Sequence, residues 1–258
     1  MRNGKMTWHD FRVACSAGLL LAVGIGGPAR AQTAVDMDLL LAVDASGSVD
    51  ATRFELQRRG YVAAFRSPQV LQAIGGGAKQ SIAVAMFQWT GPQLQAEIVP
   101  WTLIKDEGSA KSVASLIETT PRKIFGGGTS ISGAIDTAVK WFPQSPFKGE
   151  RRVIDVSGDG SNNRGRSVTR ARDEAVAADI VINGLPILAW EPDLDAYYKA
   201  NVIGGPGAFM IVAKDFDTFA DAILKKMIIE IAMGAQPGST ARRQAANASF
   251  ADGAQLKR

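Results

Sequence analysis

The chain has 258 residues, 46% of them apolar and 21% charged, which is an ordinary globular composition with enough residues for one sizeable core. Its formal net charge of +4 first suggests a nucleic-acid partner. However, residues 1–31 hold four Lys or Arg against one Asp, so residues 32–258 keep 25 Lys or Arg against 24 Asp or Glu, a net charge of +1. This balance removes the electrostatic argument for nucleic-acid binding.

Residues 1–31 have the pattern of a secretory signal peptide. Three basic residues lead into an uncharged apolar run, Val13–Gly27, and Ala29-Arg30-Ala31 forms a small-residue cleavage site before Gln32. The apolar run is shorter than the ~20 residues of a membrane span, and no later stretch reaches that length without charges. A retained N-terminal anchor is the alternative. We therefore expect an exported protein, periplasmic or secreted, with no membrane span after cleavage.

The single histidine and the single cysteine, His9 and Cys15, both lie within this signal segment. The expected mature chain has neither residue type. This excludes Cys or His nucleophile–base pairs, Cys/His zinc sites and disulfides from the mature protein.

Strand-like and helix-like segments alternate along the rest of the chain. This alternation predicts parallel strand pairing with crossover helices, an α/β fold with a three-layer, doubly wound, mostly parallel sheet. We expect one domain over residues 32–233 and a disordered tail over 234–258, which has little apolar surface to bury. The predicted strands are Met37–Val43, Gln80–Phe87, Leu94–Val99 (an edge strand ended by Pro100), Arg152–Val156, Ile180–Leu185 and Ala208–Val212. The predicted helices are Ala51–Phe65, Glu107–Ile117, Ile131–Phe142, Ser167–Ala178, Asp193–Ala200 and Phe216–Met233.

The first predicted strand runs directly into a loop of alternating oxygen-bearing side chains. Asp44, Ser46 and Ser48 occupy every second position, which places one carboxylate and two hydroxyls on the same side of the loop. The alternative is that Ser48 or Asp50 only caps the helix that follows, since both residue types are favoured N-caps.

Two later loops lie at the same end of the predicted sheet. Thr129 follows a run of three glycines, and Asp159 follows the strand Arg152–Val156. Asp155 is a rival for this second carboxylate, but it lies inside the strand, where side-chain alternation points it to a face of the sheet. Ligands of open α/β sheets bind beyond the carboxyl ends of the strands. Oxygen donors converging there, without His or Cys, favour Mg²⁺.

This combination resembles the metal-ion-dependent adhesion site of von Willebrand factor type A (VWA) domains. The resemblance covers residues 36–233, and the chain is most similar to an uncharacterised group of exported bacterial VWA-like proteins. It implies a VWA fold of the Rossmann-like type, with Asp44, Ser46, Ser48, Thr129 and Asp159 binding the metal directly or through water. The usual Thr-Asp-Gly turn of the family is Gly158-Asp159-Gly160 here, so one outer hydroxyl is absent.

The resemblance also implies how such a site would work. A protein partner would complete the coordination of Mg²⁺, with Mn²⁺ or Ca²⁺ as other cations, through an Asp or Glu carboxylate. The chain would then be a binding module and not an enzyme. Possible supporting or rim residues are Asn162, Asn163, Trp89, Trp101, Arg164 and Arg166, although ordinary turn and packing roles compete for them.

Two other classes of function stay open at this point. The first is a Mg²⁺-dependent hydrolase or phosphotransferase that uses Asp44 or Asp159 as its nucleophile. Against it, the chain has no G-x-x-x-x-G-K-[ST] motif, and Lys123 is the nearest lysine that could neutralise a phosphate. The second is a structural domain without metal.

Overall fold

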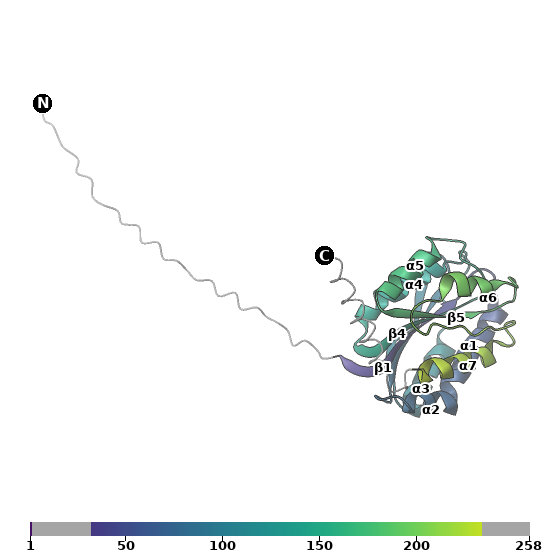
Figure 1. Cartoon of the computed structure of the whole chain (residues 1–258), viewed down its shortest axis with the longest axis horizontal. Coiled ribbons are helices and arrows are strands. Elements are labelled where there is room, and N and C mark those ends of the chain that lie inside the picture. The colour runs from purple at the N-terminus through teal and green to yellow at the C-terminus, as the bar shows by residue number, and fades with distance from the viewer. Residues whose placement is uncertain (2–31, 234–258) are drawn as a thin grey trace, which may run out of the picture. The chain divides into compact units, whose positions relative to one another are not determined.

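The computed structural model describes residues 32–233 together with Met1. Almost all of the predicted signal segment and all of the predicted tail, residues 2–31 and 234–258, lie outside the described residues. In the described part, helices cover both faces of a five-stranded sheet (Figure 1). The strands are β1 (Thr33–Asp44), β2 (Ile82–Trp89), β3 (Gln95–Ile104), β4 (Phe147–Gly158) and β5 (Ile180–Pro186).

The sheet has the strand order β3-β2-β1-β4-β5, with β3 antiparallel to its neighbour and all other pairs parallel. β1 is the central strand and is buried from Val35 to Asp44, as its continuous apolar run predicts. The chain passes from β1 to β2 on one side and later returns to β4 on the other. The strand order therefore reverses at the carboxyl end of β1, where open α/β sheets bind ligands.

The helices form one layer on each face of the sheet, so the predicted doubly wound fold is confirmed (Figure 1). One face is covered by α1 (Ala51–Arg66), α2 (Pro68–Gly75), α3 (Glu107–Thr119) and α7 (Phe219–Ala232). The other is covered by α4 (Ile131–Trp141), α5 (Val168–Ala177) and α6 (Leu194–Tyr197), which continues as a π-helical segment, η2 (Tyr198–Val202). Within residues 32–233, no helix is long and apolar enough to cross a membrane.

Two strand predictions need correction. β3 does not end at Pro100 but continues to Ile104. It is the edge strand, and Pro100 lies where the register against β2 shifts, between the pairs formed by Val99 and Thr102, so the missing N–H is tolerated. A proline at such an irregularity interrupts the pairing without ending the strand.

The predicted last strand, Ala208–Val212, is not a strand. The segment forms one isolated bridge to β5, between Met210 and Gly184, and the Phe209 backbone N–H donates to the Asn183 side chain of β5 over 2.9 Å. The preceding turn contains Gly205 and Gly207, whose φ angles are +94° and +76°. These left-handed residues turn the chain just before the segment, and a continuous ladder with β5 does not form.

Candidate metal centre

The loop after β1 brings its alternating oxygen atoms to one point. Asp44 and Ser46 are buried, and Asp44 Oδ1 accepts a hydrogen bond of 2.7 Å from the Ser46 backbone N–H. The hydroxyls of Ser46 and Ser48 are 3.2 Å apart. Ser48 Oγ in turn donates to Asp159 Oδ1 over 2.6 Å, across to the loop after β4. The two loops are thus joined through the side chains predicted to bind a metal.

The capping alternative applies to Asp50 and not to Ser48. Asp50 is the N-cap of α1, and its carboxylate accepts a hydrogen bond of 2.9 Å from the Arg53 backbone N–H. Because this donor is satisfied by Asp50, the Ser48 hydroxyl is free to bond to Asp159.

The two carboxylates of the site lie side by side, and among the described residues neither is held in a salt bridge. Asp159 is buried, and its backbone N–H is 3.4 Å from Asp44 Oδ2. Its Oδ2 atom is buried with no hydrogen-bond partner among the described residues. Among residues 32–233, neither carboxylate forms a salt bridge within 4.0 Å of a Lys or Arg.

Burial and mutual repulsion both act on the charge of these groups. Burial, followed by the negative charge of Asp159, raises the pKa of Asp44 to about 7. Burial also raises the pKa of Asp159. A divalent cation bound between the two groups would remove the repulsion and satisfy the unpaired Asp159 oxygen. The residues therefore fit a cation that prefers oxygen ligands.

Thr129 reaches the same place from the loop before α4. The preceding glycines, Gly126–Gly128, all have positive φ, at 66°, 95° and 83°, which only glycine adopts readily. The Thr129 backbone N–H donates to Asn163 Oδ1 over 2.9 Å. A methyl group at Gly160 would lie 3.6 Å from the Thr129 hydroxyl, so this hydroxyl is next to the Asp159 loop. The structure thus brings all five predicted residues together.

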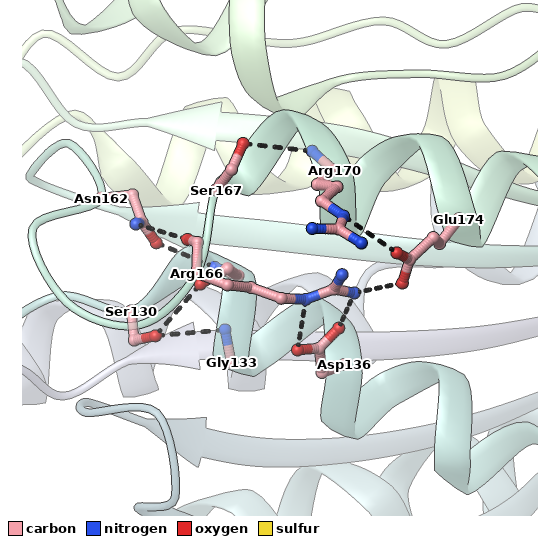
Figure 2. A network of polar contacts seen from close by, with 9 residues as sticks. Ser130, Gly133, Asp136, Asn162, Arg166, Ser167, Arg170 and Glu174 are labelled. Carbon is pink, nitrogen blue, oxygen red and sulfur yellow. Dashed lines mark hydrogen bonds and ion pairs between the residues drawn. The ribbon is translucent and has the colours of Figure 1, made fainter.

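The loop after Asp159 is anchored to α4 and α5 (Figure 2). Asn162 Oδ1 accepts a hydrogen bond of 2.9 Å from the Ser132 backbone N–H. Arg166 binds both carboxylate oxygens of Asp136, at 2.9 and 2.6 Å, and reaches Glu174 at 2.6 Å. Arg166 therefore links its loop to α4 and α5, which corrects its interpretation as a rim residue. Asn162 and Asn163 hold the Thr129 loop through its backbone N–H groups.

Two further rim candidates also have packing roles. Trp89 is fully buried, and the Trp101 side chain donates to the Trp141 backbone carbonyl over 3.1 Å. Arg164 is exposed and lies against Gly128, so it stays at the rim. Trp89 is part of the core between the sheet and α4, and the partly buried Trp101 packs against that core, as the packing alternative predicted.

Two arginines that no local sequence pattern predicts hold the first loop from outside. Arg122 donates to the backbone carbonyls of Ala45 and Val49, at 2.7 and 2.6 Å. Arg53 donates to the Ser48 carbonyl at 2.7 Å. Neither had a local signal, because their partners are backbone atoms and, for Arg122, lie more than 70 residues away in the sequence.

Exposed apolar side chains surround these arginines. Phe125 is 70% exposed and lies against the Arg122 guanidinium, 4.7 Å from its ring centre. Trp190 is 57% exposed and lies 4.4 Å from Arg53. Leu94 is also exposed and would contact a methyl group at Gly127. We call Leu94, Phe125 and Trp190 the apolar rim.

The rival carboxylate, Asp155, lies away from the site on the face of β4 that α7 covers. It is fully buried and forms a salt bridge of 2.7 Å with Lys226 of α7. This placement follows from the alternation of side chains along β4.

Known proteins resemble this chain at the levels of family and fold. The family described as "Protein of unknown function (DUF1194)" matches residues 34–235. No protein of curated function matches the chain significantly.

One solved structure with the same fold is proximal thread matrix protein 1 from the mussel byssus, described "with zinc occupied MIDAS motif". It has 17% identity and a TM-score of 0.52, and the match covers 77% of this chain and 46% of that one. A von Willebrand factor type A protein from Catenulispora acidiphila has 17% identity and a TM-score of 0.53, and the match covers 78% of this chain and 43% of that one. The pilus adhesin SpaC from Lactobacillus rhamnosus GG has 14% identity and a TM-score of 0.57, with 78% and 31% covered. This chain therefore has a VWA fold and spans less than half of the length of these proteins.

Proposed function

We propose that this chain, which belongs to the family of proteins of unknown function DUF1194, is an exported binding module whose central contact is a divalent metal ion. Asp44, Ser46, Ser48, Thr129 and Asp159 would hold the ion, directly or through water. A carboxylate of a protein partner would complete its coordination.

The observation that carries the proposal is the buried pair of carboxylates, neither of which forms a salt bridge among the described residues. Asp44 accepts a hydrogen bond from the Ser46 backbone N–H, the Ser46 and Ser48 hydroxyls contact each other, and Ser48 donates to Asp159. One Asp159 oxygen has no partner among the described residues. Two buried like charges destabilise each other unless a proton or a cation intervenes. Two carboxylates and three hydroxyls are hard oxygen donors, which suit Mg²⁺, Mn²⁺ or Ca²⁺. We favour Mg²⁺.

The composition of the site supports binding over catalysis. The two ionised carboxylates only balance the charge of a dication and the three hydroxyls add none, so a coordination position left to water can be taken by an anionic group of a partner. The cations nearest the site are already engaged: Arg53 and Arg122 bind loop carbonyls, and Lys123 donates to the Glu97 carbonyl on β3 over 2.6 Å. The adhesin and byssus matrix proteins that share the fold are consistent with a binding role.

The apolar rim gives the partner a second kind of contact. Phe125 and Trp190 flank the loop that holds Ser46 and Ser48, each stacked on an arginine that binds this loop. Exposed aromatic residues are common in the energetically important parts of protein interfaces. We propose that the partner places its carboxylate on the metal and apolar side chains on the rim.

Export rests on the sequence of residues 1–31. We propose that cleavage after Ala31 leaves Gln32 as the first residue of the mature chain, in the periplasm or outside the cell. The intact mass of the protein recovered from the cell envelope or medium tests this step. A mass that includes Met1–Ala31 would contradict cleavage.

The binding proposal is tested by capture of envelope proteins on immobilised mature chain, in Mg²⁺ and in EDTA. Thr129→Ala removes one hydroxyl of the site from a loop, so we expect it to weaken metal binding about 10–100-fold and to lose partner at limiting Mg²⁺, with partial rescue at high Mg²⁺. Thr33→Ala, an exposed change at the other end of β1 from Asp44, is the matched control and should bind normally. A partner that stays bound in EDTA, or normal binding by Thr129→Ala at limiting Mg²⁺, would rule out a metal-dependent contact.

A further inference from the structure

A fully buried tyrosine lies against the carboxylates of the candidate site. Tyr198 begins the π-helical segment η2, and its side chain is completely buried. Its ring packs on β5, where a methyl group at Gly184 would lie 2.7 Å from the ring edge. The glycine therefore leaves the space that the ring occupies. Single π-helical turns often occur at functional sites, where they change the direction of a side chain.

The hydroxyl of Tyr198 lies near the Asp44 carboxylate. A methyl group at Gly158 would lie 3.0 Å from Tyr198 Oη and 3.0 Å from Asp44 Oδ2, so the two oxygens face the same point and are at most about 6 Å apart. The same methyl group would lie 3.3 Å from Cζ2 of Trp89. Glycine at position 158 is thus what allows these three groups to approach one another.

The polar atoms around Gly158 are unpaired within the described residues. Tyr198 Oη and Trp89 Nε1 are buried donors without an acceptor, and Asp159 Oδ2 is a buried acceptor without a donor. Asp44 Oδ2 receives only the long contact of 3.4 Å from the Asp159 backbone N–H. A buried, unpaired hydroxyl is unfavourable compared with the phenylalanine that would fill the same space. The tyrosine is therefore better explained by a state in which its hydroxyl is used.

We propose that Tyr198 is a positioning residue of the metal site, whose hydroxyl donates a hydrogen bond to the Asp44 carboxylate when a divalent ion is bound. This inference rests on the proposed function, because it assumes that Asp44 holds a metal. The hydroxyl orients the carboxylate and stabilises its ionised form, as outer partners of metal ligands commonly do. Burial and the negative charges of Asp44 and Asp159 raise the pKa of Tyr198 well above its usual value, which keeps the proton on the donor.

The test is Tyr198→Phe, which removes one oxygen atom, with Tyr61→Phe as the matched control. Tyr61 is also fully buried, but it lies on the opposite face of the sheet and donates to Ser157 Oγ over 3.2 Å. The Kd for Mg²⁺ and Mn²⁺ is measured by calorimetry on the purified mature chain, and urea unfolding in EDTA is measured for the same proteins. We expect Tyr198→Phe to raise both Kd values about 10-fold, and Tyr61→Phe to leave them within about twofold of wild type.

The unfolding measurement separates positioning from general stability. In EDTA, Tyr198→Phe should unfold at the same or a higher urea concentration than wild type, because its hydroxyl is unpaired there, whereas Tyr61→Phe should unfold earlier. Wild-type metal affinity in Tyr198→Phe would overturn this inference alone. A weaker affinity would also overturn it if the variant lost as much free energy of unfolding in EDTA as it lost in metal binding. A wild-type protein that binds no divalent ion would overturn the metal site and this inference together. Metal binding without metal-dependent capture of a partner would overturn only the adhesion role.

Discussion

At the scale of single residues, a proton and a metal ion compete for Asp44. Its pKa is raised to about 7, first by burial and then by the charge of Asp159. The carboxyl must lose its proton before a cation can bind. We therefore expect the affinity for Mg²⁺ to fall about 10-fold from pH 8 to pH 6 and to change little above pH 8. Calorimetry in buffers with different ionisation enthalpies would measure both the affinity and the proton release.

Thr129→Ala is the control for this pH dependence. It removes a neutral hydroxyl and leaves both carboxylates, so its affinity should be lower at every pH with the same change between pH 6 and pH 8. An affinity that is constant from pH 6 to pH 8 would contradict the raised pKa or the role of Asp44 as a ligand.

The sequence identifies the residues that are close along the chain to a strand end, but not those that reach the site from elsewhere. Alternation after a buried strand predicts Asp44, Ser46 and Ser48. Asp159 is predicted because it comes directly after another parallel strand, β4. In contrast, Arg122 and Tyr198 depend on long-range packing that no local pattern encodes. For the same reason the sequence left Trp89 open between a rim role and packing, and the structure buries it: position near a loop does not determine whether a large side chain points into the core.

At the scale of elements, a buried charge cluster joins the sheet to α7. Lys226 contacts Asp155 of β4 at 2.7 Å and Glu230 at 3.2 Å, and all three are buried. Asn183 of β5 donates to the same Glu230 oxygen that Lys226 contacts. Since the lysine is shared by two carboxylates, its loss would leave both groups buried beside each other.

We expect Lys226→Met to lower the free energy of unfolding by about 3–5 kcal/mol, because breaking a buried ion pair leaves uncompensated charge. The matched control is Lys225→Met, an exposed neighbour on the same helix, which should change stability by less than about 0.5 kcal/mol. Urea unfolding of both variants measures the difference. Equal effects of the two substitutions would show that the cluster does not hold α7 on the sheet.

Elements with a simple periodicity are predicted well, and those decided by neighbouring structure are not. The central strand β1 and the helix α3 lie within a few residues of their predicted positions, because apolar runs and caps define them. α2, in contrast, was not predicted; it begins at Pro68 after the N-cap Ser67 and has only eight residues. A helix so short depends on packing against α7 more than on its own sequence.

At the scale of the whole molecule, burial of ionisable groups links the fold to pH and to the metal. Asp44, at the end of β1, and Asp155, on the face of β4 that α7 covers, are fully buried carboxyls, and each has a pKa raised to about 7 from the ordinary value of 3.8. For Asp155, burial raises the pKa more than Lys226 lowers it. Between pH 3.8 and about pH 7, Asp44 and Asp155 are protonated in the folded chain but have lost their protons in the unfolded chain. Stability must therefore fall as pH rises in this range.

We expect the metal-free protein to lose stability from pH 5 to pH 7, by up to about 1.4 kcal/mol per pH unit for each group. A bound metal ion replaces the proton at Asp44, so saturating Mg²⁺ should stabilise the protein little at pH 5 and more at pH 8, by about 2.7 kcal/mol at 100 times its Kd. Urea unfolding at pH 5, 6.5 and 8, in EDTA and in Mg²⁺, measures both effects. Asp44→Asn should lose the Mg²⁺ effect and keep the part of the pH dependence that comes from Asp155. Metal-free stability that rises from pH 5 to pH 7 would contradict the raised pKa values, and a Mg²⁺ effect that persists in Asp44→Asn would move the metal site elsewhere.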